Sequence, residues 1–293
     1  MTIREALAQA RRELGGVGIP DSGLEAEVLV MHASGLTREQ LFAGPDEQLS
    51  PEAARGLASV LQRRLQREPL AYVTGSREFF GLDFRVDHRV LVPRQETETL
   101  VEETLARVRE HFPDGECRIV DVGAGSGVIA VSLAKSLPRA QVYATDISSE
   151  ALEVATLNCQ RHGVDDRVTL FQGDLLDPAP PEVDVVVANL PYVPDSEWDG
   201  LQPEIRLFEP RQALVSGETG LELAERLLDQ VAQLDPAPAL VLMELGEGQA
   251  EVIHQRSEAP FSGWAVSRYR DLGGLDRGVV LDDMRNRRKP LAV

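Results

Sequence analysis

The spacing of hydrophobic and polar positions divides the chain into a short helical part and a longer part of mixed character. In residues 1–70, apolar side chains recur every three or four positions, the period of an amphipathic helix, for example at Ala6, Ala10 and Leu14. Capping boxes, in which Ser or Thr precedes Glu or Gln by three residues, predict helix starts at Thr2/Glu5, Ser22/Glu25 and Thr37/Gln40. Ser50-Pro51 predicts another start, because proline suits the first helical turn. We therefore expect a small helical domain over residues 1–70.

Beyond this part, apolar and polar residues alternate around Gly75 and Gly81, which predicts a β-hairpin linking two domains over residues 71–92. A helix is expected from Thr97 to Phe112, and strands alternate with helices after it. Strands are predicted at about 117–122, 141–146, 168–173, 183–188, 239–245, 264–271 and 278–283. Helices are predicted at about 126–137, 149–162, 219–234 and 247–257.

Repeated alternation of strands and helices predicts an α/β fold with a doubly wound, mostly parallel, seven-stranded sheet over residues 93–293. The net charge of −18 argues against a large nucleic-acid-binding surface, because phosphate binding needs clustered Lys and Arg. Apolar runs are too short to span a membrane, and the charged N-terminus lacks the apolar segment of a signal peptide. With only two cysteines and five scattered histidines, we expect a cytoplasmic protein without a metal site.

A glycine-rich turn follows the first strand of the sheet domain and precedes a helix. Free N–H groups at the helix start, together with small glycines, let a ligand approach the backbone closely. A dinucleotide site would have glycine at the sixth position of GxGxxG, where this chain has Val128. The spacing suits a smaller, cationic cofactor instead. The predicted cofactor-binding residues of this loop are Gly123, Ala124, Gly125, Ser126 and Gly127.

Acidic residues end the next two strands, at the sheet edge where open α/β sheets bind ligands. Asp146 is positioned to accept hydrogen bonds from ribose hydroxyls, and Asp174 from an adenine amino group, with Leu175 flanking the ring. By itself, each acid more often caps a helix or forms a turn. Together with the glycine loop, they resemble the class I S-adenosylmethionine-dependent methyltransferases. The resemblance implies their Rossmann-like fold and a sulfonium cofactor lying across the first three strand ends.

The fourth strand ends in Asn189-Leu190-Pro191-Tyr192. Methyltransferases that modify a planar nitrogen have an Asn/Asp-x-Pro-Tyr motif at this place, so the resemblance implies a catalytic and substrate-binding role beside the cofactor. The Asn189 side-chain oxygen and the Leu190 carbonyl would each accept an N–H and direct the nitrogen lone pair at the methyl group. Pro191 would shape the loop, and Tyr192 would stack on the planar substrate group. The motif leaves three substrates open: adenine in DNA, adenine in ribosomal RNA and a protein glutamine amide.

Further resemblance comes from the segments REPLAYVTGSREFFG, VLVPRQETETLV, FEPRQALVSGETGL, MELGEGQ and YRDLGGLDRGVV. They are similar to segments of the protein-glutamine N5-methyltransferases of peptide-chain release factors (the PrmC/HemK family), and the similarity covers nearly the whole chain. Two positions depart from that family, which commonly has proline where this chain has Gln95 and Leu190. The resemblance implies methylation of the N5 amide nitrogen of glutamine in the Gly-Gly-Gln motif of class I release factors.

On this interpretation the partner is a release factor, and the helical domain of residues 1–70 binds it. The alternative is that this helical domain only stabilises the protein. We expect a monomer without direct nucleic-acid or membrane contacts. Two other functions stay open. An adenine N6 methyltransferase acting on nucleic acid would need a basic surface, which the acidic composition disfavours. A non-catalytic, cofactor-binding adaptor would not need an intact Asn189, Pro191 and Tyr192.

Overall fold

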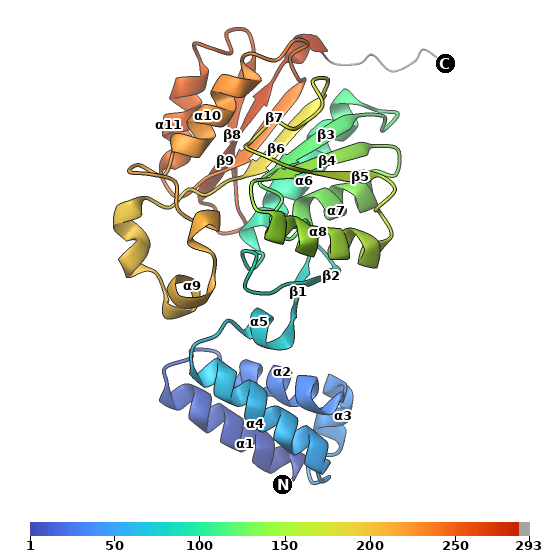
Figure 1. The fold of residues 1–293 in the computed structure, drawn as a ribbon, viewed down its shortest axis with the longest axis vertical. Helices are drawn as coiled ribbons and strands as arrows, with labels where there is room; N and C mark the ends of the chain where they lie inside the picture. The colour runs from blue at the N-terminus through green and yellow to red at the C-terminus, as the bar shows by residue number, and fades with distance from the viewer. Residues whose placement is uncertain (287–293) are drawn as a thin grey trace. The chain divides into compact units, whose positions relative to one another are not determined.

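The structure, a computed structural model, describes residues 1–286. Residues 287–293, the end of the predicted sheet domain, lie outside the described part. The chain folds as two units (Figure 1). The first unit contains Met1–Ser76 and Gln202–Phe208, and the second contains Arg77–Leu201 and the chain from Glu209 onward. Nothing in the sequence pattern separates Gln202–Phe208 from the sheet domain, so its place in the first unit is a finding of the tertiary structure.

Helices form the first unit. They are α1 (Ile3–Gly16), α2 (Ser22–Ser34), α3 (Arg38–Ala43), α4 (Pro51–Leu65), α5 (Leu70–Thr74) and α9 (Pro203–Phe208). Predicted helix starts are confirmed at Thr2, Thr37 and Ser50-Pro51. The predicted Ser22/Glu25 capping box was wrong, because Ser22 is already helical and Asp21 precedes it as the N-cap residue, without a side-chain cap. The Glu25 carboxylate is used elsewhere, in an ion pair.

That ion pair involves a buried guanidinium beside the apolar core of the first unit. Arg64 is only 4% exposed. Its Nε donates to Glu25 Oε2 at 2.6 Å, and its Nη1 donates to Glu204 Oε1 at 3.0 Å. The other oxygen of Glu204 accepts from Arg67 Nη2 at 2.8 Å. Glu204 lies on α9, a helix that is too short to be stable by itself. These ion pairs therefore attach α9 to the other helices of the first unit.

In the described part of the chain, seven strands form the sheet of the second unit. They are β3 (Arg118–Val122), β4 (Gln141–Asp146), β5 (Val168–Gln172), β6 (Val185–Asn189), β7 (Leu240–Glu244), β8 (Ala265–Arg270) and β9 (Asp276–Asp282). Their order is β5-β4-β3-β6-β7-β9-β8. The first five are parallel neighbours, whereas β9 is antiparallel to β7 and β8. The predicted mostly parallel, seven-stranded sheet is confirmed, and the carboxyl ends of its five parallel strands share one edge.

Helices cover both faces of this sheet (Figure 1). Helices α6, α7 and α8 pack on one face, and α10 and α11 pack on the other. Their bounds are α6 (Glu96–His111), α7 (Val128–Ser136), α8 (Ser149–His162), α10 (Glu222–Val231) and α11 (Gln249–Ser257). In β6, Val185 and Val187 face the first group and Val186 faces the second. The unbroken apolar run of this strand therefore reflects burial on both faces.

Short elements complete the chain. The predicted hairpin consists of β1 (Ser76–Phe79) and β2 (Leu82–Arg85), and the rings of Phe79 and Phe84 are buried in the core on the α6 side. Short 3₁₀ helices are η1 (Asp195–Gly200), η2 (Arg211–Ala213) and η3 (Met284–Asn286). None of the helices within residues 1–286 is long and apolar enough to cross a membrane.

Candidate active site

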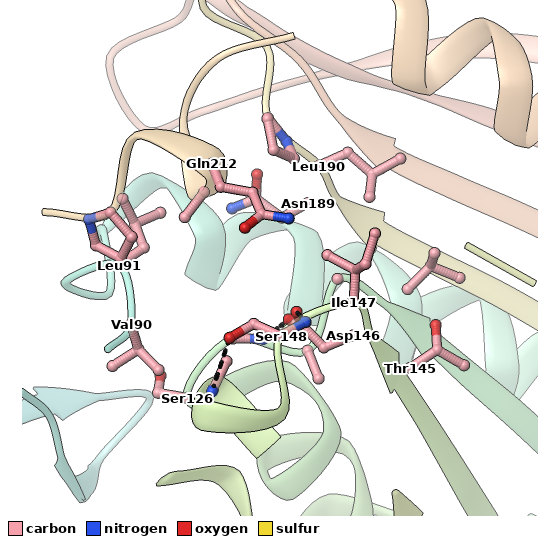
Figure 2. Close-up of a pocket in the computed structure, with 18 of the residues that line it drawn as sticks. Val90, Leu91, Ser126, Thr145, Asp146, Ile147, Ser148, Asn189, Leu190 and Gln212 are labelled. Carbon is pink, nitrogen blue, oxygen red and sulfur yellow. Dashed lines mark hydrogen bonds between the residues drawn. The ribbon is translucent and has the colours of Figure 1, made fainter. Parts of the chain in front are cut away.

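A cavity of about 360 Å³ lies at the carboxyl edge of the sheet, within the second unit. This volume is typical of small-molecule sites. Figure 2 shows Asp146 and Ser148 on one side of the cavity and Asn189 and Gln212 on the other. Most predicted site residues line it: Gly123, Ala124, Gly125, Ser126, Asp146, Asp174, Leu175, Asn189, Leu190 and Pro191. Among the residues that the structure describes, the lining does not include the predicted Gly127 and Tyr192.

The glycines of the turn after β3 serve different purposes. A Cβ on Gly123 would lie 3.1 Å from Leu190 Cδ2. A Cβ on Gly127 would lie 3.2 Å from the Cβ of Ala155 on α8. Both glycines therefore permit close packing of chain segments, and Gly127 packs against α8 outside the cavity. A Cβ on Gly125 would meet no atom within 4 Å, so the backbone of this cavity-lining glycine is open to a ligand.

The Asp146 carboxylate holds this loop in shape. Its Oδ2 accepts the N–H of Gly125 at 2.8 Å, and its Oδ1 accepts the N–H of Ser148 at 2.9 Å. Burial raises the pKa of Asp146, although the N–H bonds oppose this rise. Each carboxylate oxygen can accept more than one hydrogen bond. The Asp146 side chain can therefore still accept the hydrogen bonds from ribose hydroxyls that were predicted for it.

Asp121 is a candidate that the sequence reasoning did not single out. This residue of β3 is fully buried, and its Oδ2 accepts the N–H of Ala130 at 3.0 Å. Its Oδ1 has no partner within the described residues. Burial raises the pKa of Asp121 to about 7 against the effect of the Ala130 N–H, and the nearby charge of Asp146 adds to the rise. The signal in the sequence was an acid inside the apolar strand RIVDV.

The loop after β5 places Asp174 and Leu175 in the lining of the cavity. Asp174 forms an ion pair with Arg226 of α10, which also lines the cavity. Leu175 is 7% exposed and has a φ of 50°, an uncommon conformation for a bulky side chain. The proposed contact of Asp174 with an adenine amino group stays a prediction.

Asn189 ends β6 at the cavity, and its carboxamide has a defined partner. Its Nδ2 donates to Oγ1 of Thr97 at 3.0 Å, and Thr97, on α6, is only 3% exposed. Glu244 is the neighbour of Asn189 in register on β7 and is 2% exposed. Burial raises the pKa of Glu244 to about 7. Leu190 is 7% exposed and packs on Gly123, so leucine fills the position where the resembling family commonly has proline.

Tyr192 does not line the main cavity, although Leu190 and Pro191 of its motif do. It lines a smaller pocket together with Leu190, Pro191 and Glu244, and its backbone carbonyl accepts from Gln249 Nε2 at 2.9 Å. Burial raises the pKa of Tyr192 to about 12, and the charge of Glu244 adds to the rise. The stacking of Tyr192 on a planar substrate group stays a prediction.

Two segments far apart in sequence meet at the cavity through Glu209. Its Oε1 accepts from Arg94 Nη2 at 2.6 Å, and its Oε2 accepts the N–H of Val92 at 3.0 Å. These contacts hold the chain just before η2. Gln212, within η2, lines the cavity near Asn189 (Figure 2). No separate sequence signal points to these residues, which belong to the segments VLVPRQETETLV and FEPRQALVSGETGL and were identified only through resemblance.

Known proteins match this chain over nearly its whole length. The family PrmC N-terminal domain matches residues 5–75, and the family Methyltransferase small domain matches residues 101–208. The release factor glutamine methyltransferase of Moorella thermoacetica is 43% identical over 284 residues, covering 94% of this chain and 97% of the relative. That of Geobacter sulfurreducens is 41% identical over 280 residues, covering 95% of each. The chain belongs to the release factor glutamine methyltransferase family.

Solved structures share the fold. The hMettl16 catalytic domain superposes with a TM-score of 0.58 at 15% identity, covering 83% of this chain and 86% of that one. A methyltransferase from Pyrococcus furiosus gives a TM-score of 0.50 at 18% identity, covering 70% and 90%. At these identities the likeness concerns the fold alone, and it supports the predicted class I methyltransferase architecture.

S-adenosylmethionine is the methyl donor that the release factor glutamine methyltransferase family implies, and the site fits it. Gly125 leaves open backbone for a ligand. Asp146 has acceptor capacity for hydroxyl groups. Asp121, on the strand before this loop, does not line the cavity. The open backbone and the acceptors at the cavity therefore match a nucleoside with free hydroxyl groups.

Proposed function

We propose that this protein methylates the N5 amide nitrogen of the glutamine in the Gly-Gly-Gln motif of class I peptide-chain release factors. The names of its relatives support this substrate. The observation that supports it most is the place of Asn189, which lines the cavity while its NH₂ group donates to Thr97. This arrangement leaves the carboxamide oxygen available to accept an N–H from a planar amide.

An amide nitrogen is a weak nucleophile because its lone pair is delocalised into the carbonyl group. In our proposal, Asn189 Oδ1 and the Leu190 carbonyl each accept one N–H of the substrate amide and turn the lone pair toward the donor. When bound, S-adenosylmethionine supplies a methyl group whose C–S bond breaks, leaving its electron pair on sulfur, as the N–C bond forms and one N–H proton passes to water. Pro191 lines the same wall of the cavity.

We also propose that the helical unit grips the release factor. Large apolar side chains of this unit are more than half exposed at Leu24, Phe42 and Leu207. Exposed apolar groups of this size can serve as anchors in a protein interface. A monomeric state, a cytoplasmic location and the lack of direct nucleic-acid contacts stay predictions. The relatives give no support to an adenine N6 methyltransferase or to a non-catalytic adaptor.

Substitution of Asn189 tests the proposed function. Asn189→Ala is expected to slow single-turnover methylation of a release factor about 10²- to 10³-fold at saturating cofactor, as for loss of one preorganised hydrogen-bonding group. Asn189→Asp keeps an acceptor oxygen and should retain more activity than the alanine variant. Mass spectrometry of the Gly-Gly-Gln peptide measures the gain of one methyl group.

The matched control is Gln172→Ala, which removes a carboxamide from the end of β5, the edge strand of the sheet, outside the cavity lining. Its rate should equal that of the wild type. If Asn189→Ala transfers methyl as fast as the wild type, Asn189 is only a turn residue. If the wild type itself does not modify the glutamine, the proposed substrate is wrong.

A further inference from the structure

Two buried polar side chains adjoin the Asn189 carboxamide: Thr97, which also lines the cavity, and Glu244, which does not. Thr97 and Glu244 are 3% and 2% exposed, so neither side chain relies on bulk water for its hydrogen bonds. Asn189 Nδ2 donates to Thr97 Oγ1 at 3.0 Å. Glu244 is the neighbour of Asn189 in register on β7, and its Oε2 has no hydrogen-bond partner among the described residues. Three groups from α6, β6 and β7 therefore meet at one point.

The Asn189 NH₂ group donates to the Thr97 hydroxyl, and the neighbouring Glu244 side chain is ionised above its raised pKa of about 7. In that form Glu244 only accepts hydrogen bonds. The Asn189 NH₂ group must then face Thr97 and Glu244. A carboxamide turned by half a rotation would direct its oxygen at the Glu244 carboxylate, placing two acceptors against each other in a buried site.

We propose that Thr97 and Glu244 are positioning residues that orient the Asn189 carboxamide, so that its NH₂ group points into the protein and its oxygen points to the substrate amide. This inference rests on the proposed function for its catalytic consequence, but the orientation itself is a property of the free protein. In this scheme Thr97, although it lines the cavity, does not bond to the substrate amide, and Glu244 lies outside the cavity lining. Both act through Asn189.

The orientation is measured directly by NMR with asparagine as the only ¹⁵N-labelled residue type. The chain has three asparagines, Asn158, Asn189 and Asn286, and the spectrum of Asn189→Ala identifies the Asn189 signals. The Asn189 NH₂ protons should exchange slowly with water in the wild type. Thr97→Val keeps the shape of the side chain but removes the acceptor, so exchange should accelerate at least about ten-fold. Thr97→Ser should restore slow exchange.

Two internal controls accompany this measurement. The Asn158 NH₂ group donates to the carbonyls of Arg85 and Ser126, and its exchange should not respond to Thr97→Val. Thr104→Val removes another buried hydroxyl from α6, whose partner within the described part of the chain is the carbonyl of Leu100 in its own helix. That variant should leave the Asn189 signals unchanged. Equal exchange of the Asn189 NH₂ group in the wild type and Thr97→Val would overturn the proposed orientation.

The catalytic arm is a double-mutant cycle on single-turnover rates at saturating cofactor. Thr97→Val should slow methyl transfer at least about ten-fold, the effect of a misaligned reacting group, and calorimetry should give unchanged cofactor affinity. Glu244→Gln should also slow transfer, to a smaller extent, because glutamine keeps one acceptor oxygen beside Asn189. In an Asn189→Ala background, Thr97→Val should cause no further loss, because Thr97 acts through Asn189.

An additive loss in the double variant would assign Thr97 a general structural role and refute the positioning scheme. A wild type that does not methylate release factor would instead refute the proposed function, and the exchange measurement would still decide the orientation of Asn189.

Discussion

Replacing Asp146 tests how the carboxyl edge of the sheet binds the cofactor. The carboxylate accepts the N–H of Gly125 with one oxygen and the N–H of Ser148 with the other. Asp146→Ala removes both acceptors together with any bonds to cofactor hydroxyls. Asp146→Asn has the same shape but only one acceptor oxygen, so it can keep one of the two N–H partners and directs an NH₂ group at the other.

Hydrogen bonds to a charged group contribute about 1.5–3 kcal/mol, and about 1.4 kcal/mol is a factor of ten in affinity, so Asp146→Ala should weaken cofactor binding about 10- to 150-fold. Asp146→Asn should fall between the wild type and alanine. Burial raises the pKa of Asp146, so removing its charge offsets part of the loss in folding. The free energy of unfolding should therefore decrease by less than about 2 kcal/mol.

Isothermal titration calorimetry with S-adenosylmethionine measures the affinities, and chemical denaturation checks that each variant is folded. The matched control is Asp166→Ala, which removes the same charge from a side chain that is 77% exposed and should leave affinity unchanged. A folded Asp146→Ala variant with wild-type affinity would remove Asp146 from the cofactor site. An Asn variant that binds more weakly than the Ala variant would show that the acceptor count is the wrong explanation.

Two further predictions concern stability and partner binding. The pKa of Asp121 is raised from 3.8 to about 7, so the contribution of Asp121 to the free energy of unfolding falls as pH rises through this window. Asp121→Asn should therefore be more stable than the wild type at pH 8, by up to about 4 kcal/mol. The difference should be smaller at pH 5. Parallel stability–pH curves from chemical denaturation would contradict this. Leu24→Ser combined with Phe42→Ser should raise the KM for an intact release factor but not for a Gly-Gly-Gln peptide. The control Leu272→Ser, at a 90%-exposed position of the second unit, should change neither KM. Equal effects of the double variant on both substrates would make the helical unit a stabilising appendage.

The sequence by itself determined the features that depend on short-range or repeated patterns. The capping boxes at Thr2 and Thr37 were readable because each joins residues three positions apart. The parallel sheet followed from alternating apolar runs and helices, and this topology brings Asp146, Asp174 and Asn189 to one edge without knowledge of any side-chain contact. Ser22 shows the limit even of local rules, because a helix start one residue earlier made Asp21 the N-cap.

Only the tertiary structure decided which distant side chains meet. Thr97 bonds to Asn189 across 92 positions of the chain, and Arg64 bonds to Glu204 across 140. Such pairs depend on strand order and on how helices pack over the sheet, and neither leaves a periodic signal in the sequence. The same holds for Tyr192, whose motif suggested the main cavity but which lines only the neighbouring smaller pocket within the described residues. Packing of whole elements, rather than the identity of a motif, sets the direction of each side chain.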